Sequence, residues 1–292
     1  MKIFFIVNRH SGKGRAGTYL PNIKKEIALH GHELEIYETK EKTLTVETAA
    51  ENANNCDMLL CMGGDGTLNE VVSGYIKAKS QTPLGYIPTG STNDFASNYK
   101  LSRKPIAALR KILKMNITPA DVGFFNGKSF CYVAAAGAFS EVSYATSQKL
   151  KNLLGHLAYI LEGIKSVSKI KPMKLKIETN EKVYEGSYLV CTVSNSTTIG
   201  GIFHFDDDLV SLNDGVFETV LVSEPQKSAE YLALFQELLM GDFAGKYITV
   251  INSSEVKITS ESPLAWSLDG EYGGEYCSTN IKNLHKKLNL IV

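Results

Sequence analysis

Three short loops rich in Gly, Ser, Thr and Asp constrain the fold of this 292-residue chain most, because each follows an apolar run of strand length. The runs are Ile3–Val7, Asp57–Met62 and Leu84–Ile87, and residues with helical periodicity separate them. Continuous apolar strands that alternate with helices predict a parallel sheet covered on both faces. The carboxyl ends of parallel strands meet at one edge of the sheet, so the loops after the second and third runs should face one crevice.

The pattern changes near residue 117, where short β-rich runs separated by Asn-Gly and Asp-Gly turns begin. Runs such as Phe130–Ala135, Tyr188–Val193 and Val216–Val222 predict an antiparallel sandwich. We therefore expect an α/β N-terminal domain with a parallel sheet over residues 1–118, and a mostly antiparallel C-terminal β-sandwich over 119–285. The last segment, 286–292, could pack with the first domain instead of the second.

Composition excludes several classes of protein. The 31 basic and 31 acidic residues cancel, so no global field attracts nucleic acid or an anionic membrane. No window approaches the roughly 20 apolar residues that a spanning helix needs. Five cysteines without a C-x-x-C pair indicate reduced thiols. We expect a cytoplasmic protein that contacts the inner face of a membrane only peripherally, and no oligomeric state is predicted.

The first loop contains Gly12, Gly14 and Gly17 in the spacing G-x-G-x-x-G, which is also the fingerprint of dinucleotide-binding folds. Four polar residues separate this strand from its first glycine, and that spacing weakens the dinucleotide interpretation. Small residues before a helix, with Lys13 and Arg15 nearby, favour an anion either way. A plain strand-to-helix turn is the alternative.

The second loop, Gly63-Gly64-Asp65-Gly66-Thr67, places one carboxylate among three glycines before an amphipathic helix. Glycines allow backbone N–H groups to approach phosphate oxygens closely. A carboxylate there would repel a bare phosphate but suits Mg²⁺ or a substrate proton. The alternative is that Asp65 caps a helix.

The third loop, Thr89–Ala96, carries small hydroxyl and amide side chains together with Asp94. This carboxylate could cap a short helix, but a second carboxylate opposite Asp65 suits a metal or a hydroxyl group better.

The motifs together resemble the diacylglycerol kinase catalytic domain family, which includes bacterial lipid kinases and the sphingosine and ceramide kinases. The resemblance is carried by Gly-Gly-Asp-Gly-Thr-Leu-Asn-Glu at 63–70, by the Thr89–Ala96 loop and by Asp269-Gly270-Glu271, and it covers essentially the whole chain. It implies an ATP-binding α/β domain, a β-sandwich for the lipid substrate and a cleft between them. The implied reaction is ATP- and Mg²⁺-dependent transfer of the γ-phosphoryl group to a lipid hydroxyl, of diacylglycerol or a related glycerolipid.

The resemblance also implies roles for individual residues. Glu271 would accept the proton, with Asp269 beside it, while Asp65 and Asp94 would act through Mg²⁺ or the substrate hydroxyl. The residues implied around ATP are Asn8, Ser11, Gly12, Thr39, Gly64, Asp65, Gly66, Thr67, Leu68, Asn69, Glu70 and Thr89.

A second, structural Mg²⁺ in the sandwich is implied near residues 211–216. Asp214 would supply the carboxylate, and Ser211 and Val216 the backbone carbonyls. An Asn-Asp-Gly hairpin turn is the alternative. The chain departs from the family here, because Asp206-Asp207-Asp208 replaces a Pro-rich approach, and it also has Arg9 where the family usually has Pro.

A basic belt between Lys149 and Lys176 lies beside apolar residues and could dock on an anionic membrane. A solvated helix face is an equally good interpretation. Two other functions stay open: an NAD kinase-like nucleotide kinase, which would share the second loop, and a non-catalytic lipid-binding regulator.

Overall fold

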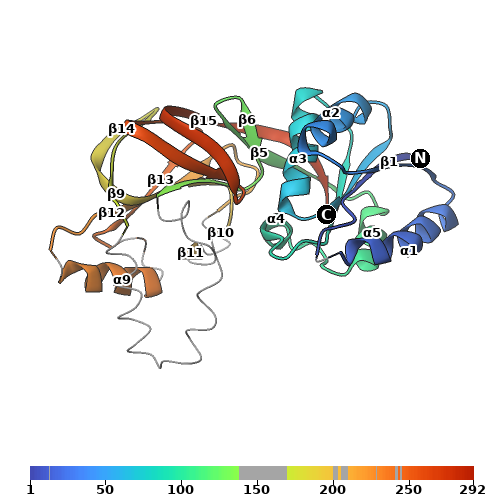
Figure 1. The fold of residues 1–292 in the computed structure, drawn as a ribbon, viewed down its shortest axis with the longest axis horizontal. Helices are drawn as coiled ribbons and strands as arrows, with labels where there is room; N and C mark the ends of the chain where they lie inside the picture. The colour runs from blue at the N-terminus through green and yellow to red at the C-terminus, as the bar shows by residue number, and fades with distance from the viewer. Residues whose placement is uncertain are drawn as a thin grey trace. The chain divides into compact units, whose positions relative to one another are not determined.

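The structure is a computed structural model that describes residues 1–12, 14–137, 170–199, 203–204, 210–227, 229–240, 243 and 245–292 (Figure 1). The chain divides into two compact units. The first unit comprises Met1–Tyr132, Ser211–Gly215 and Asn283–Val292, and the second comprises Val133–Val210 and Val216–Lys282. The first unit thus extends beyond the boundary predicted near residue 118.

The sheet of the first unit has the strand order β2-β1-β3-β4-β15. Its strands are β1 (Lys2–Val7), β2 (Glu33–Glu38), β3 (Met58–Gly63), β4 (Leu84–Pro88) and the end of β15 (Glu271–Ile291). All four neighbouring pairs are parallel. β1, β3 and β4 consist almost entirely of buried residues, as expected for strands covered on both faces.

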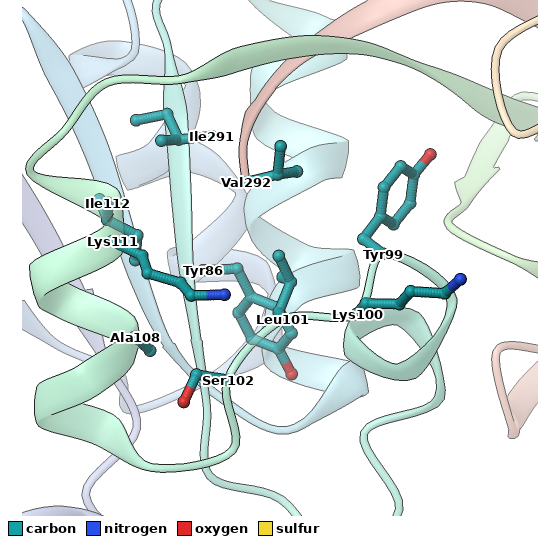
Figure 2. Close-up of a pocket in the computed structure, with 10 residues that line it drawn as sticks. All are labelled: Tyr86, Tyr99, Lys100, Leu101, Ser102, Ala108, Lys111, Ile112, Ile291 and Val292. Carbon is teal, nitrogen blue, oxygen red and sulfur yellow. The ribbon is translucent and has the colours of Figure 1, made fainter.

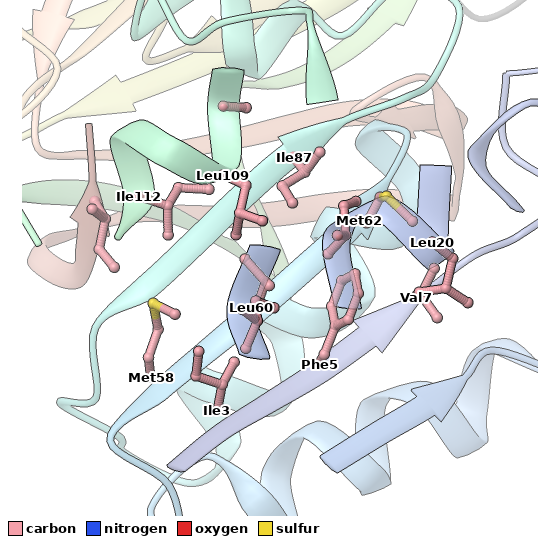
Figure 3. Close-up of a cluster of buried hydrophobic side chains, with 14 of the residues drawn as sticks. Ile3, Phe5, Val7, Leu20, Met58, Leu60, Met62, Ile87, Leu109 and Ile112 are labelled. Atoms are coloured by element: carbon pink, nitrogen blue, oxygen red, sulfur yellow. The ribbon is translucent and has the colours of Figure 1, made fainter. Parts of the chain in front are cut away.

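Helices α1 (Ala16–Leu29) and α5 (Pro105–Ile112) pack on one face of this sheet (Figures 1 and 3). Alternate strand residues such as Phe5 and Leu60 meet Ile23 of α1 and Leu109 of α5 in one buried cluster. Alternate residues of the strands and the apolar face of each helix therefore contribute to the same core.

Helices α2 (Lys42–Asn52) and α3 (Asp65–Lys77) pack against each other. Gly74 permits their close approach, because a Cβ atom there would lie 2.6 Å from the Cβ of Ala49. α3 begins directly after β3, which brings Asp65 to the carboxyl end of the strand.

The first unit also contains α4 (Asp94–Asn98) and a hairpin of β5 (Ile117–Phe125) and β6 (Lys128–Phe130). Asn126 and Gly127 turn the hairpin with positive φ values of 44° and 89°. The strand predicted over residues 130–135 is wrong, because β6 ends at Phe130 and β7 begins at Val133. The chain passes from the first unit to the second in this break.

The second unit is β-rich, and its strand pairs are antiparallel. Its longer strands are β7 (Val133–Gly137), β8 (Met173–Thr179), β9 (Val183–Ser194), β12 (Phe217–Ser223), β13 (Ile248–Ser253), β14 (Glu255–Leu268) and the first part of β15. The short strands β10 (Thr198–Ile199) and β11 (Phe203–His204) pair separately, and α9 spans Glu230–Met240. Trp266 of β14 is 1% exposed and lies in the core.

Candidate active site

The three glycine-rich loops of the first unit continue the hydrogen bonding of the sheet beyond the strand ends. The N–H of Asn8 donates to the carbonyl of Met62 at 2.9 Å, and the N–H of Thr89 donates to the carbonyl of Gly63 at 2.8 Å. The loops after β1, β3 and β4 therefore begin at the same edge of the sheet, as the parallel pattern predicted.

Glycines allow these loops to touch through their backbones. A Cβ atom on Gly12, whose φ is +61°, would collide with the carbonyl oxygen of Thr89. A Cβ atom on Gly90 would lie 2.6 Å from the Cα of Gly64 and 2.7 Å from Oδ1 of Asn93. The small residues are thus required by the contact between loops and not only by turn formation.

Side-chain hydrogen bonds tie the same loops together. The hydroxyl groups of Ser11 and Thr89 lie 2.6 Å apart, and Nδ2 of Asn8 donates to Oγ1 of Thr67 at 3.0 Å. The structure brings together these four residues, which were predicted from separate motifs to surround ATP.

Asp65 is the first residue of α3, yet its carboxylate caps a different helix. It accepts hydrogen bonds from the N–H groups of Asp94 at 3.1 Å and Phe95 at 3.4 Å, and from Oγ1 of Thr92 at 3.3 Å. α3 itself has Gly64 as its N-cap residue and no side-chain cap. Its first N–H groups, which have no acceptor inside the helix, are therefore left for an anion.

Two carboxylates come close together in this cradle. Burial raises the pKa of Asp65, and burial followed by the charge of Asp65 raises the pKa of Asp94. Oδ2 of Asp94 accepts one hydrogen bond, from the hydroxyl of Tyr132 at 3.4 Å. Two neighbouring acidic groups that repel each other are stabilised by a divalent cation, and oxygen ligands suit Mg²⁺. The residues present therefore fit a Mg²⁺-bound nucleotide.

The other residues predicted around ATP differ in how they are placed. The N–H of Thr39 donates to the carbonyl of Val7, which places Thr39 at the end of β2 beside the first loop. Leu68 is fully buried, so its side chain belongs to the core. Nδ2 of Asn69 donates to the carbonyl of Ser129 in β6, at 3.1 Å. Gly66 and Glu70 lie in the same first turns of α3 and are half-buried.

In the second unit, Asp269 and Gly270 form the two-residue turn between β14 and β15, with φ values of 51° and 86°. Asp269 is 5% exposed, and its Oδ1 accepts a hydrogen bond from the N–H of Val133 at 3.1 Å. The N–H of Asp269 donates to the carbonyl of Val133 at 2.9 Å. This carboxylate therefore fixes the turn to the start of β7.

Glu271 follows the turn as the first residue of β15, and its side chain is exposed. Asp269 and Glu271 look equivalent in the sequence motif, but they differ in burial and in hydrogen bonding. Asp269 is engaged with the backbone, whereas Glu271 is accessible for exchange of a proton.

The segment predicted to hold a structural metal folds as a turn in the first unit up to Gly215. Asp214 and Ser211 are exposed, and Oγ of Ser211 lies 3.4 Å from Oδ1 of Asn213. Val216 belongs to the second unit. Within the described part of the chain, no group of three or more His, Cys, Asp or Glu side chains could hold a metal ion. The structural Mg²⁺ therefore has no support from a ligand cluster.

Asp121 is the polar residue that sequence reasoning missed. Its side chain has no exposed surface and accepts hydrogen bonds from the N–H groups of Gly215 and Lys286, each at 2.7 Å. Nδ1 of His285 lies 3.2 Å from its Oδ1. The buried carboxylate joins three separate chain segments of the first unit. Its position in the apolar run Ala120-Asp121-Val122 was the available signal, because buried carboxylates are rare unless paired.

Three sequence predictions lie outside the described residues. These are Lys13 of the first loop, the Asp206-Asp207-Asp208 run, and the part of the basic belt from Lys149 to residue 169.

Glycine-rich loops around two carboxylates, on an α/β unit followed by a β-rich unit, define an enzyme that transfers phosphoryl groups. Comparison with known families agrees: residues 2–125 match the diacylglycerol kinase catalytic domain, and residues 133–292 match the YegS C-terminal NAD kinase beta sandwich-like domain. The chain belongs to the diacylglycerol kinase catalytic domain family. It is a lipid kinase, a phosphotransferase with an alcohol group as acceptor.

Similar proteins extend over nearly the whole chain. A diacylglycerol kinase of Bacillus subtilis is 30% identical over 290 residues, covering 98% of this chain and 95% of that protein. A diacylglycerol kinase of Staphylococcus aureus is 32% identical, covering 98% and 90%. The crystal structure of a candidate diacylglycerol kinase from Bacillus anthracis has a TM-score of 0.81 at 26% identity, covering 99% of this chain and 94% of that one.

Proposed function

We propose that this lipid kinase transfers the γ-phosphoryl group of ATP to the hydroxyl of diacylglycerol or a related glycerolipid. The observation that carries the proposal is the pair of carboxylates, the buried Asp65 and the half-buried Asp94, inside a cradle of three glycine-rich loops. In this proposal the α/β unit with its parallel strands binds ATP, and the β-sandwich unit receives the lipid.

The phosphates of ATP would lie against the loop backbones. The uncapped first turn of α3 supplies N–H groups, and the Ser11 and Thr89 hydroxyls supply donors from the neighbouring loops. Asp94 would hold Mg²⁺, with Asp65 fixing the α4 backbone from which Asp94 projects. When bound, Mg²⁺ would neutralise charge on the phosphate oxygens.

The acceptor hydroxyl would lose its proton to Glu271 late in the transfer. Phosphoryl transfer depends mainly on positioning and charge neutralisation, so one exposed carboxylate is a sufficient base. Asp269 would be a positioning residue, because its carboxylate is already bound to the N–H of Val133.

A cavity of about 480 Å³ in the second unit is our candidate for the apolar body of the lipid. Its lining mixes apolar residues such as Met173 and Leu264 with charged ones such as Lys171, Lys174 and Glu261, which suits a lipid with a polar head. In the described parts of the chain, no helix is long and apolar enough to cross a membrane. We propose that the enzyme takes its lipid by peripheral contact with the membrane surface.

The test is transfer of radiolabel from γ-labelled ATP, with Mg²⁺, to defined acceptors in mixed micelles. The acceptors are diacylglycerol, monoacylglycerol, ceramide, sphingosine and undecaprenol, with NAD in a parallel reaction, and mass spectrometry identifies each product. We expect phosphatidate from diacylglycerol to form fastest.

The other outcomes assign the competing functions. Labelled NAD without any labelled lipid would replace the proposal with an NAD kinase-like activity. Lipid binding without transfer to any acceptor would indicate a non-catalytic regulator. If a sphingoid base or a polyprenol is labelled in place of diacylglycerol, the protein is still a lipid kinase but its acceptor is that lipid.

A further inference from the structure

A cavity in the first unit lies apart from the glycine-rich loops, at the edge of β4. β15 pairs with β4 only at Leu84 and Gly85, so this pairing stops before Tyr86. The segment Tyr99–Ser102 lines the space beyond, and the cavity volume is about 260 Å³ (Figure 2). None of the residues predicted for ATP binding, proton transfer or a metal lines this cavity.

The lining combines an apolar surface with two exposed lysines, Lys100 and Lys111. Leu101, Ala108 and Ile112 supply aliphatic walls. Lys111 extends from α5 and points its amine toward the middle of the cavity (Figure 2). That amine forms no ion pair or hydrogen bond with any residue that the structure describes. An ammonium group above an apolar surface is the complement of an anion carried on an apolar body.

The charge of the surrounding segment has the same sign. Between residues 100 and 120 the chain has no acidic residue and six basic ones: Lys100, Arg103, Lys104, Arg110, Lys111 and Lys114. Arg110 is neutralised by Glu26, at 2.7 Å. Arg103 donates to neutral acceptors, the carbonyl of Thr92 and the hydroxyl of Ser97. This segment therefore attracts an anion, while the charges of Asp65, Asp94 and Asp121 reach the two tyrosines of the wall.

We propose that this cavity binds a small amphipathic monoanion, a carboxylate on a short apolar chain. The Lys111 amine, which points into the cavity, balances one negative charge, whereas a phosphate dianion usually binds a fork of donors or several N–H groups. The volume is below the range of about 300 to 1,000 Å³ for sites that take drug-sized ligands, so a short chain fits better than a long one.

The cavity wall is bonded to the proposed catalytic loops. The hydroxyl of Tyr86 donates to the carbonyl of Gly63 at 3.2 Å. The ring of Phe95 packs between Tyr86 and Tyr99, with centroid distances of 6.1 and 4.8 Å. The backbone N–H of Phe95 donates to the carboxylate of Asp65. A ligand that moves either tyrosine would therefore shift the Asp65 carboxylate. This coupling rests on the proposed kinase function, whereas the binding itself does not.

Binding is tested on the full-length protein with three probes, by isothermal titration calorimetry and saturation-transfer NMR. Octanoate carries both the chain and the charge, 1-octanol carries the chain alone, and inorganic phosphate carries charge alone. We expect octanoate to bind and the other two to bind at least about fivefold more weakly. Equal binding of 1-octanol would overturn the proposal, since the amine would then contribute nothing.

Two matched lysine variants locate the site. Lys111→Gln should weaken octanoate binding about fivefold, while Lys114→Gln, exposed nearby but outside the lining, should change it by less than about twofold. Ser102→Leu, which fills the cavity from its half-buried rim, should abolish binding. Unchanged affinity in Lys111→Gln, or equal losses in both lysine variants, would place octanoate elsewhere. Thermal melting curves would verify that each variant is folded.

The coupling between the cavity and Asp65 is measured separately, through the KM for ATP. Octanoate should change KM for ATP in the wild-type enzyme. The half-maximal change should need about fivefold more octanoate in Lys111→Gln, and Ser102→Leu should show no change. If octanoate binds without changing KM, the link from the cavity to Asp65 is wrong. If no lipid is phosphorylated at all, the proposed function fails while the binding result stands.

Discussion

The first unit and the second unit each present a pair of acidic residues beside a glycine, and the two pairs are built alike. Asp65 and Asp269 are both buried, and both accept hydrogen bonds from backbone N–H groups. Their neighbours Asp94 and Glu271 are more accessible and have fewer partners. In each unit one carboxylate organises the backbone, and the other is the one that we propose takes part in the chemistry.

The means of assembly differ between the two pairs. The loops of the first unit contact each other through glycines that have no room for a Cβ atom. The turn of the second unit has open space around Gly270 but needs its positive φ of 86°. Glycine therefore provides space in one region and conformational freedom in the other.

The largest effect should come from Glu271→Gln. Because Glu271 is exposed, its loss should leave the free energy of unfolding unchanged, while loss of the base lowers kcat about 10²- to 10⁴-fold. Steady-state kinetics with diacylglycerol measure the change. Glu185→Gln, an exposed carboxylate on β9, is the matched control and should keep wild-type kcat. Full activity of Glu271→Gln would remove the assignment of the base.

Asp269→Ala should destabilise the protein by roughly 1 to 3 kcal/mol, because the N–H of Val133 loses its acceptor. Asp269→Asn keeps an acceptor and tolerates the φ of 51°, so it should restore most of the stability and activity. Urea unfolding and kcat measure both variants. If Asp269→Asn stays stable but loses as much activity as Glu271→Gln, Asp269 takes part in proton transfer and the two carboxylates exchange roles.

Gly90→Ala and Gly270→Asn compare the two uses of glycine. The added Cβ on Gly90 would separate the loops at a cost of about 1 to 3 kcal/mol in the free energy of unfolding, and KM for ATP should rise. Asn at Gly270 accepts a positive φ and meets no atom within 4 Å of its Cβ, so stability should change by less than about 1 kcal/mol. A reversed order of stability would contradict the proposed difference.

The loops and the turn could be predicted because their signals are local. Gly63–Thr67 and Asp269-Gly270-Glu271 are short motifs, and β1, β3 and β4 are continuous apolar runs.

The contacts between distant segments could not be predicted. Asp65 was weighed as a helix cap or as a metal ligand, but the helix that it caps begins 29 positions later, at Asp94. The role of Asp121 depends on Gly215 and Lys286, which are 94 and 165 positions away. The division between units at Tyr132 falls inside an apolar run that reads as one strand. Such features depend on packing in three dimensions, which a linear pattern does not encode.

The smallest effect concerns Asp94, which accepts fewer of the hydrogen bonds described above than Asp65 does. Because the pKa of Asp94 is raised, the folded state holds its proton more tightly than the unfolded state does. This group therefore favours folding most at pH values below the usual carboxyl pKa of about 4, and that contribution is lost as pH rises through the raised value.

Without nucleotide or Mg²⁺, Asp94→Asn should therefore flatten the decline in stability above about pH 4. The gain at pH 7 should be at most about 1 kcal/mol, because Asp94 is half-buried and solvent screens it. Urea unfolding at pH 5 and pH 8 measures the difference, and Glu47→Gln on the exposed side of α2 should follow the wild-type curve. A steeper decline in Asp94→Asn would mean that a partner stabilises the charged form of Asp94, and the division of each pair into one organising and one reacting carboxylate would fail in the first unit.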